Sequence, residues 1–479
     1  MNTKALRQKV LDLAIHGKLV PQNPNDESAT VLLEKIRAEK VEKIKKGELK
    51  ADKKDSFIFV GSDKRHYEQF ADGTVKDIED EIPYDVPEGW AWCRLKQLSL
   101  DMADGPFGSN LKAEHYTKNK EARIIQLSNI GEYGWREENT KYTTLEHAKN
   151  NISRSIVEPG NVVIAKMMPA GRAIICPNNE KMYVLSSDAV KLVPTSLINS
   201  NYLLNSINSP FFRASVTDNV QGTTRLRTSI SKLRECFFPL PPLKEQILIV
   251  HAIENAISHI DVLEQNKMDL QNLITQAKSK ILDLAIHGKL VPQDPNDEPA
   301  EELLKRIATS DNRPYEKVEL SEIDWTLPNN WCLCHFGDIA TVINGKNQSK
   351  VENQNGKYPI YGSGGKMGRA DDYICPENCT IIGRKGSINN PIFVEEKFWN
   401  VDTAFGLCPS EAILPKFLFY FCEYFDFTTL DSSTTLPSLT KTNIQQIIFA
   451  LPPIEEQKRI LDKTEELFGK LDEIVLNLI

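Results

Sequence analysis

LPPLKEQILIVHAIENAISHIDVLEQNKMDLQNLITQAKSKILDLAIHGKLVP, residues 240–292, decides the fold, because both of its ends recur elsewhere in the chain. The second end continues to residue 298, and residues 282–298 repeat residues 11–27 (LDLAIHGKLVPQNPNDE) with 16 of 17 positions identical. The first end, LPPLKEQ, returns as LPPIEEQ at residues 451–457. The central segment therefore joins two repeated pieces, and each end of the chain carries one of them.

Between these pieces, apolar residues recur with a heptad period that predicts one helix over residues 243–287. Stop signals for it follow at Gly288 and Pro292. The same register, moved onto the two ends of the chain, predicts an antiparallel partner assembled from the C-terminal and N-terminal helices. Two unrelated amphipathic surface helices are the alternative, but shared period and flanking sequence disfavour it. The seam consists of Ile253, Ile260, Ile274 and Ile281 at a, and Ala256, Leu263, Leu270, Ala277 and Leu284 at d, with Lys267 as its interruption.

Length and composition favour a globular, non-exported protein. With 479 residues the chain has room for about three domains. It has no run of 18 apolar residues, and its first residues begin an amphipathic helix rather than a signal peptide. Nine cysteines without a disulfide-like spacing predict free thiols in a reducing cytoplasm. The net charge of −8 argues against extensive coating by nucleic acid but allows a local basic face.

A third duplication marks where two globular units begin. IPYDVPEGWAWCRL at residues 82–95 aligns with IDWTLPNNWCLCHF at residues 323–336. Short strands and one helix are expected in each unit, and in the first unit they include strands at residues 161–166 and 183–185 and a helix at residues 198–208. The predicted fold is α+β, with two globular α/β domains separated by a long antiparallel two-helix coiled coil and related by an internal pseudo-two-fold repeat. Its segments are 1–40 (N-terminal repeat), 41–81 (charged helix and linker), 82–240 (first domain), 241–311 (central helix), 312–451 (second domain) and 452–479 (C-terminal helix).

Each unit has a polar loop just before the duplicated LPP. Glycine allows close backbone approach, threonine and serine hydroxyls can bond phosphates or base edges, and arginine can clamp phosphate or guanine. A plain polar surface loop is the alternative, but the matched position favours binding. The candidates are Gln221, Gly222, Thr223, Thr224, Arg225 and Arg227 in the first unit, and Ser433, Thr434, Thr435, Ser438 and Lys441 in the second.

Each unit also places cations after a hydrophobic strand. They are Lys166 and Arg172 in the first unit and Arg384 and Lys385, followed by Ser387, in the second. Ordinary surface charge is the alternative for any one of them.

YGSGGKMG at residues 361–368 resembles a phosphate-cradling loop but lacks the GxxxxGK spacing of nucleotide-binding proteins. We therefore expect a flexible, backbone-rich loop beside a nucleic-acid phosphate, with Ser363, Gly364 and Lys366 as contacts.

No catalytic or metal-binding pattern stands out. Cys332, Cys334, Cys375 and Cys379 have spacings unlike the common zinc fingers, so buried strand cysteines are favoured over a metal site. The tetrapeptide of amino methyltransferases, the glycine-rich cofactor turn, and the GxSxG and HExxH motifs do not occur. A protein that binds and positions is therefore favoured over an enzyme, and a self-contained methyltransferase is disfavoured.

The chain resembles the specificity subunit of type I restriction-modification systems. The resemblance lies in the two domains that each precede a PP-(L/I)-x-EQ helix, the repeated LDLAIHGKLVPQ, and the phrases IPYDVPEGW, YPIYGSGGKMG and IIGRKGSIN. It implies a noncatalytic reader of double-stranded DNA whose domains each read one half of a gapped, asymmetric target, with the helices as a ruler.

The same resemblance implies two modification subunits, which hold S-adenosylmethionine and methylate adenine, and restriction subunits that use ATP and Mg²⁺. No cofactor is expected on this chain itself. Because two copies of one partner need two like surfaces, we expect the duplicated frame to bind them, through Glu245, Gln246, Glu456 and Gln457. A coiled-coil scaffold with two protein-binding modules and no DNA is the alternative.

Overall fold

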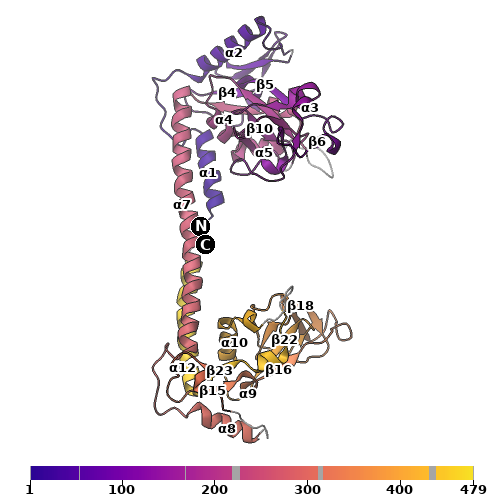
Figure 1. The fold of residues 1–479 in the computed structure, drawn as a ribbon. Coiled ribbons are helices and arrows are strands. Elements are labelled where there is room, and N and C mark those ends of the chain that lie inside the picture. Colours follow the sequence, from indigo (N-terminus) through magenta and orange to yellow (C-terminus); the bar gives the residue numbers. More distant parts are fainter. Residues whose placement is uncertain are drawn as a thin grey trace. The chain divides into compact units, whose positions relative to one another are not determined.

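The computed structural model describes residues 2–52, 54–167, 169–217, 227–310, 317–430 and 438–477. The chain forms two compact units, Met1–Gln265 and Asn266–Ile479, and one helix, α7 (Leu243–Ile286), contributes to both (Figure 1). Within the described ranges, none of the helices combines the length and apolar character needed to cross a membrane.

The first unit is built around two sheets. The strand order of its four-stranded sheet is β11 (Ala173–Ile175), β10 (Val162–Ala165), β13 (Ala189–Pro194), β5 (Ser99–Asp104). The strand order of its five-stranded sheet is β6 (Tyr116–Thr117), β8 (Tyr142–Thr143), β7 (Ala122–Ile125), β12 (Tyr183–Leu185), β9 (Ile156–Val157). A pair formed by β4 (Ala91–Arg94) and β14 (Phe237–Leu240) joins the beginning of the domain to its end. The helices are α1 (Thr3–Ile15), α2 (Ala29–Lys45), α3 (Leu145–Asn150), α4 (Ser200–Ile207), α5 (Pro210–Thr217) and α6 (Ile230–Glu235).

The second unit repeats this plan with fewer strands. Its four-stranded sheet has the order β16 (Ala340–Asn344), β22 (Ala404–Pro409), β19 (Cys379–Gly383), β20 (Ile392–Val394), and β18 (Gly365–Ala370), β17 (Tyr358–Gly362) and β21 (Trp399–Asn400) form a second sheet. The closing pair is β15 (Cys332–His335) with β23 (Ile448–Leu451). The helices are α8 (Ala300–Ser310), α9 (Phe336–Ile339), α10 (Pro415–Tyr424), α11 (Lys441–Gln445) and α12 (Ile454–Asn477).

In each unit α7 packs against a helix that runs the opposite way. Thr3 bonds Glu264 and the more distant Gln22 bonds Glu245, so the repeat that begins with α1 runs antiparallel to α7 in the first unit. In the second unit, Lys278 of α7 pairs with Asp472 of α12, and Gln293 just beyond α7 bonds Glu456 at the start of α12. Both pairings match the predicted antiparallel arrangement.

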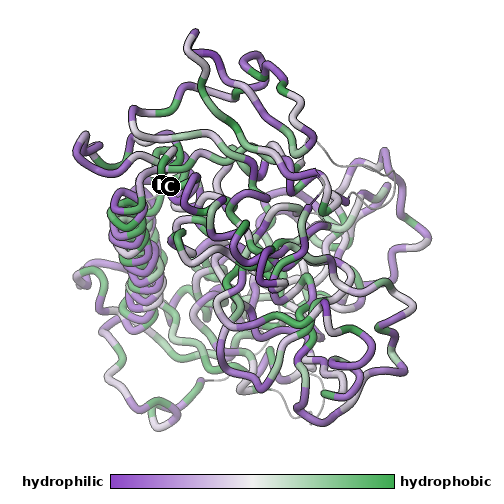
Figure 2. Tube along the Cα trace, turned by 90° about the horizontal axis from the view of Figure 1, so that it is seen from above, coloured by the Kyte–Doolittle hydropathy of each residue, from purple (hydrophilic) through white to green (hydrophobic). Residues whose placement is uncertain are grey.

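The predicted seam is buried at three of its four apolar a positions, because Ile281 is half-buried, and at none of its five d positions. Ile253, Ile260 and Ile274 are buried, whereas Leu263 at d is 43% exposed. Both hydrophobic and hydrophilic residues colour the turns of the long helix in Figure 2. The helix is therefore amphipathic, but its apolar side is not covered along its whole length.

Two expectations for the second unit are wrong. Residues 361–368 are not a flexible loop, because they form most of the hairpin of β17 and β18, in which Tyr361 pairs with Lys366. The cysteines are not all free, because Cys379 and Cys408 face each other on the adjacent strands β19 and β22, 4.6 Å apart at Cα, and form a disulfide. The other seven cysteines are buried thiols.

Candidate nucleic-acid interface

The strand directions of the first unit bring three polar residues to one sheet edge. Strands β5 and β10 both run antiparallel to β13, so they end at the edge where β13 begins. Asp104 ends β5, Lys166 follows β10, and Asp188 precedes β13. The amide of Lys166 donates to the carbonyl of Asp188 at 2.8 Å, and its ammonium forms an ion pair with Asp104.

Arg227 reaches the same edge from the segment that follows the polar loop. It forms a β-bridge with Met167, and the amide of Thr228 donates to the carbonyl of Lys166 at 2.9 Å. The guanidinium of Arg227 donates to the carbonyl of Ser187 and lies 4.0 Å from Asp188. The edge borders a cavity of about 680 Å³ lined by Asp104, Gly105, Pro106, Phe107, Gly108, Lys166, Met167, Ser187, Asp188, Arg227, Thr228, Ser229 and Lys232.

The second unit builds the same edge with different side chains. The amide of Arg384, after β19, donates to the carbonyl of Thr403 at 2.8 Å, just as Lys166 does to Asp188. Lys385 forms a β-bridge with Ser438, as Met167 does with Arg227. The two elements that the sequence singled out in each unit, the cations after a strand and the segment before LPP, therefore meet in space.

The tip of the β17–β18 hairpin adds to this edge. A Cβ atom placed on Gly383 would lie 2.2 Å from the carbonyl oxygen of Ser387 and 3.1 Å from Cβ of Ser363. The strand end, the following loop and the hairpin tip therefore pack closely around a position that only glycine can occupy. Gly364, Lys366, Lys385 and Ser387 are exposed there, and Lys441 is half-buried at the beginning of α11.

Of the predicted DNA-contacting cations, one is buried in an ion pair and another lies away from the cavity. Lys166 is buried, because its ammonium group is held by Asp104. Arg172 does not line the cavity, and burial lowers the pKa of its guanidinium beside Glu132 and Arg213. The remaining candidates, Gln221, Gly222, Thr223, Thr224, Arg225, Ser433, Thr434 and Thr435, lie outside the described residues.

The four residues expected to bind the modification subunits are buried within their own units, so their side chains contact neighbours in the same unit. Glu245 accepts hydrogen bonds from Trp90 Nε1 at 3.0 Å and Gln22 Nε2 at 3.2 Å. Gln246 accepts from the amide of Asn199 and donates to the carbonyl of Pro241, both at 3.0 Å. These bonds use the polar atoms that a partner subunit would need.

The second unit repeats this arrangement residue by residue. Glu456 accepts from Trp331 Nε1 and from Gln293 Nε2, both at 3.0 Å. Gln457 accepts from the amide of Leu414 at 2.8 Å and donates to the carbonyls of Ala412 and Pro452 at 3.0 Å. We call each set of glutamine, tryptophan and glutamate a joint: Gln22, Trp90 and Glu245 in the first unit, and Gln293, Trp331 and Glu456 in the second.

The joints predict a pH dependence of stability. Burial raises the pKa of Glu245 above its ordinary value of 4.5, against the lowering effect of its two hydrogen bonds. The folded state therefore holds the carboxyl proton of Glu245 more tightly than the unfolded state does. The resulting contribution to the free energy of unfolding is complete below pH 4.5 and is lost as the pH rises through the raised pKa. We therefore expect the stability of the wild type relative to Glu245→Gln to fall as the pH rises from 4.5, in denaturant unfolding. An unchanged difference would contradict this assignment.

A matched pair of glycines at these two edges was not singled out from the sequence. Gly105 after β5 and Gly345 after β16 pack so tightly that an added Cβ would lie 1.7 Å from the carbonyl oxygen of Ser186 and 1.8 Å from that of Val401. The residues beyond them differ, since Phe107 stands two residues after Gly105 and Asn347 two residues after Gly345, and both are exposed. The sequence feature that could have identified this pair is a glycine directly after a strand, in DGPFG and in NGKN.

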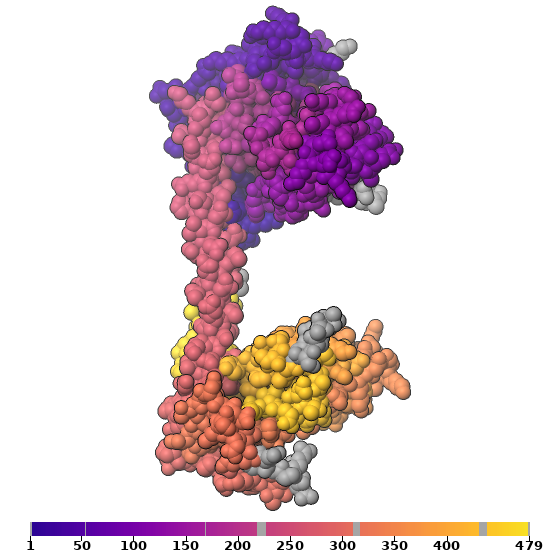
Figure 3. Space-filling model, in the orientation of Figure 1, coloured from indigo at the N-terminus to yellow at the C-terminus, as the bar shows by residue number. Residues whose placement is uncertain are grey.

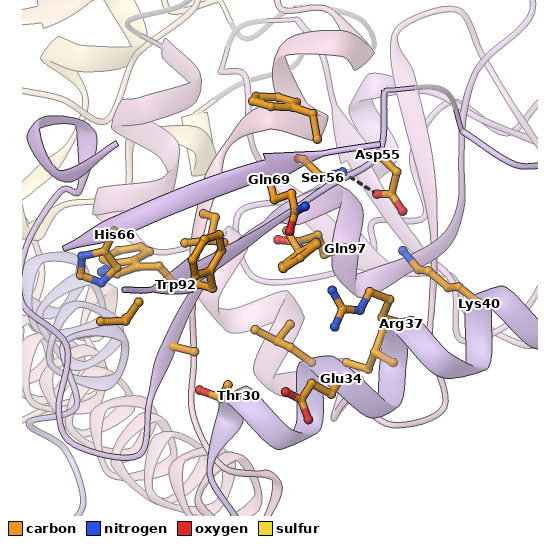
Figure 4. A pocket seen from close by; sticks show the side chains of 18 of the residues that line it. Thr30, Glu34, Arg37, Lys40, Asp55, Ser56, His66, Gln69, Trp92 and Gln97 are labelled. Carbon is orange, nitrogen blue, oxygen red and sulfur yellow. Dashed lines mark hydrogen bonds between the residues drawn. The ribbon is translucent and has the colours of Figure 1, made fainter. Parts of the chain in front are cut away.

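A separate cavity of about 360 Å³ lies between α2 and the sheet of β1 (Ser56–Val60), β2 (His66–Phe70) and β3 (Val75–Asp77) (Figure 4). Arg37 and Lys40 of α2 border it opposite Ser56 and Gln69. Burial lowers the pKa of Lys40 to about 8, and its ammonium donates to the carbonyl of Lys96 at 2.9 Å. Among the described residues of the second unit, no strand follows α8 before β15, so this cavity is not part of the repeated plan.

Comparisons with known proteins identify the family, and a solved structure shares the fold. The specificity subunit of the EcoAI type I restriction enzyme of Escherichia coli is 26% identical to this chain, over 97% of this chain and 88% of its own length. The specificity subunit of the EcoEI enzyme, also from Escherichia coli, is 27% identical over 70% of this chain and 61% of its own length. A solved chain from work on complex assembly and conformational transition of the type I R-M system has the same fold, with a TM-score of 0.55, 17% identity and coverage of 83% and 94%.

The family described as "Type I restriction modification DNA specificity domain" matches residues 111–272 and 328–476. These two ranges contain most of the strands of both units and much of the repeated frame. The chain belongs to the family of type I restriction-modification specificity subunits.

Proposed function

We propose that this chain selects the DNA target of a type I restriction-modification complex, with each unit reading one half of a gapped, asymmetric site. The observation that carries the proposal is the pair of equivalent sheet edges with different side chains. Arg227 and Met167 meet in the first unit, where Ser438 and Lys385 meet in the second. A shared backbone frame with unlike donors and acceptors suits the reading of two unlike half-sites.

The chain's own chemistry favours selection over catalysis. The charged groups at the first edge pair with one another, as Lys166 does with Asp104, rather than forming a nucleophile with a base. Methylation and cleavage are therefore assigned to modification and restriction subunits, which would hold S-adenosylmethionine, ATP and Mg²⁺. A scaffold without DNA binding would leave the different loops at equivalent edges without a role.

Exposed apolar residues on α7 replace the buried glutamates as the proposed contacts for the modification subunits. Ile247, Leu248 and Val262 are exposed on the part of α7 in the first unit, and Met268 and Leu273 on the part in the second. The surface of α7 is visible in Figure 3, in rose. Apolar side chains exposed on a helix rich in charged residues are typical of a protein interface.

We expect Arg227→Ala and Lys385→Ala to relax base selection in different half-sites. Each loss of a bidentate base contact costs about 1–3 kcal/mol at one position, whereas a lost phosphate contact weakens all sequences alike. Selection of bound sequences from a randomised library, with the chain assembled with its modification subunits, measures both effects. Lys305→Ala, an exposed lysine on α8, is the control and should preserve selection. Equal relaxation of both half-sites by Arg227→Ala would contradict separate reading.

A further inference from the structure

Phe107 is the most exposed large hydrophobic residue among those the structure describes, with 83% of its surface accessible. Exposed phenyl rings can supply apolar contacts to a binding partner. It lies in the short segment after β5, at the sheet edge that borders the cavity in the first unit. Its exposure leaves the ring available to a partner from outside the chain.

The backbone around Phe107 is fixed. The amide of Gly105 donates to the carbonyl of Ala189 at 3.0 Å, and Pro106 is buried. On the other side, the amide of Asn110 donates to the carbonyl of Phe107 at 2.8 Å, which closes a turn. The ring is thus presented from a positioned backbone, so little conformational entropy is lost when it makes a contact.

The neighbours of Phe107 are suited to the edges of bases. Arg227 and Asp188 line the same cavity, and such groups pair with guanine and cytosine, respectively, in the major groove. The apolar group that bases present in this groove is the 5-methyl group of thymine, which accepts contact from a phenyl ring. The two aspartates, Asp104 and Asp188, disfavour the close approach of a phosphate backbone.

We propose that Phe107 reads the 5-methyl group of a thymine in the half-site selected by the first unit. This inference rests on the proposed function of the chain as a DNA reader. Two residues after its equivalent glycine the second unit has Asn347 where the first has Phe107, so thymine-methyl reading at this position belongs to the first unit alone.

Replacement of single thymines by uracil tests the inference, because uracil lacks only the methyl group. The selected target is first obtained from a randomised library with the assembled complex, and the half-site of the first unit is the one that Arg227→Ala relaxes. Each thymine there is then replaced by uracil in turn. We expect one replacement to weaken binding about fourfold, as for one buried methyl group, and Phe107→Ala to abolish this difference.

The controls separate the possible outcomes. Phe107→Leu should restore part of the discrimination, and Val75→Ala, an exposed apolar residue on β3, should keep all of it. A half-site without thymine on either strand, or equal binding of uracil and thymine at every position, would overturn the inference while leaving the proposed function intact. If the wild-type complex selects no sequence, the proposed function itself fails.

Discussion

Gly105→Ala is expected to destabilise the first unit by about 3 kcal/mol, the upper end of the range for overpacked positions. The new methyl group would lie 1.7 Å from the carbonyl oxygen of Ser186, a backbone atom that cannot rotate away as a side chain could. The end of β5 must therefore separate from the beginning of β13. Gly345→Ala should have the same effect in the second unit, where the distance to the carbonyl oxygen of Val401 is 1.8 Å.

Hydrogen exchange measured by mass spectrometry checks this result, because it reports each unit separately. Gly105→Ala should accelerate exchange in β5 and β13 only, and Gly345→Ala in β16 and β22 only. The control is Gly469→Ala on α12, where an added Cβ meets none of the described atoms within 4 Å. In selection from a randomised library, each of the two edge variants should lose base preference in one half-site only. Loss of preference in both half-sites with either variant would contradict independent reading by the two edges.

The sequence predicted those elements of the units whose residues are locally distinctive. Strands were expected at residues 161–166 and 183–185, where β10 and β12 lie, and a helix at residues 198–208, where α4 lies. Their apolar runs between turn residues suffice to identify them. The hairpin of β17 and β18 was missed because its glycines and Lys366 are typical of a loop, and its strand pairing depends on contacts the local sequence does not reveal.

The candidate site was predicted only in part, because its residues come from segments that are distant in the sequence. The sequence identified the cations after a strand and the loop before LPP as separate candidates, and their meeting follows from the order of the strands. It assigned Glu245 to partner binding because two copies of one partner need two like surfaces, which the duplicated frame offers. The donor that permits its burial, Trp90, is 155 positions away. Each joint takes its glutamine, its tryptophan and its glutamate from a different one of the three duplicated stretches. This gives a physical reason why all three stretches are repeated in the chain.

Charge reversal at the joints is therefore expected to unfold one unit rather than to act on assembly alone. Glu245→Lys would replace a buried acceptor with an ammonium facing the N–H donors of Trp90 and Gln22. An uncompensated buried charge of this kind costs about 3–5 kcal/mol. Glu456→Lys should do the same beside Trp331 and Gln293.

Substitutions of graded severity separate a joint from a partner-binding surface. Glu245→Gln keeps one acceptor oxygen for two donors, so it should cost about 1–3 kcal/mol for the donor left unpaired. Leu248→Lys, on the exposed side of the same helix, should leave the free energy of unfolding unchanged and weaken co-purification with the modification subunit. Chemical denaturation and co-purification measure the two effects independently. Suppose that Glu245→Lys left the free energy of unfolding unchanged but abolished binding of the modification subunit. Glu245 would then be a partner contact, and the joint would not be needed for the stability of the unit.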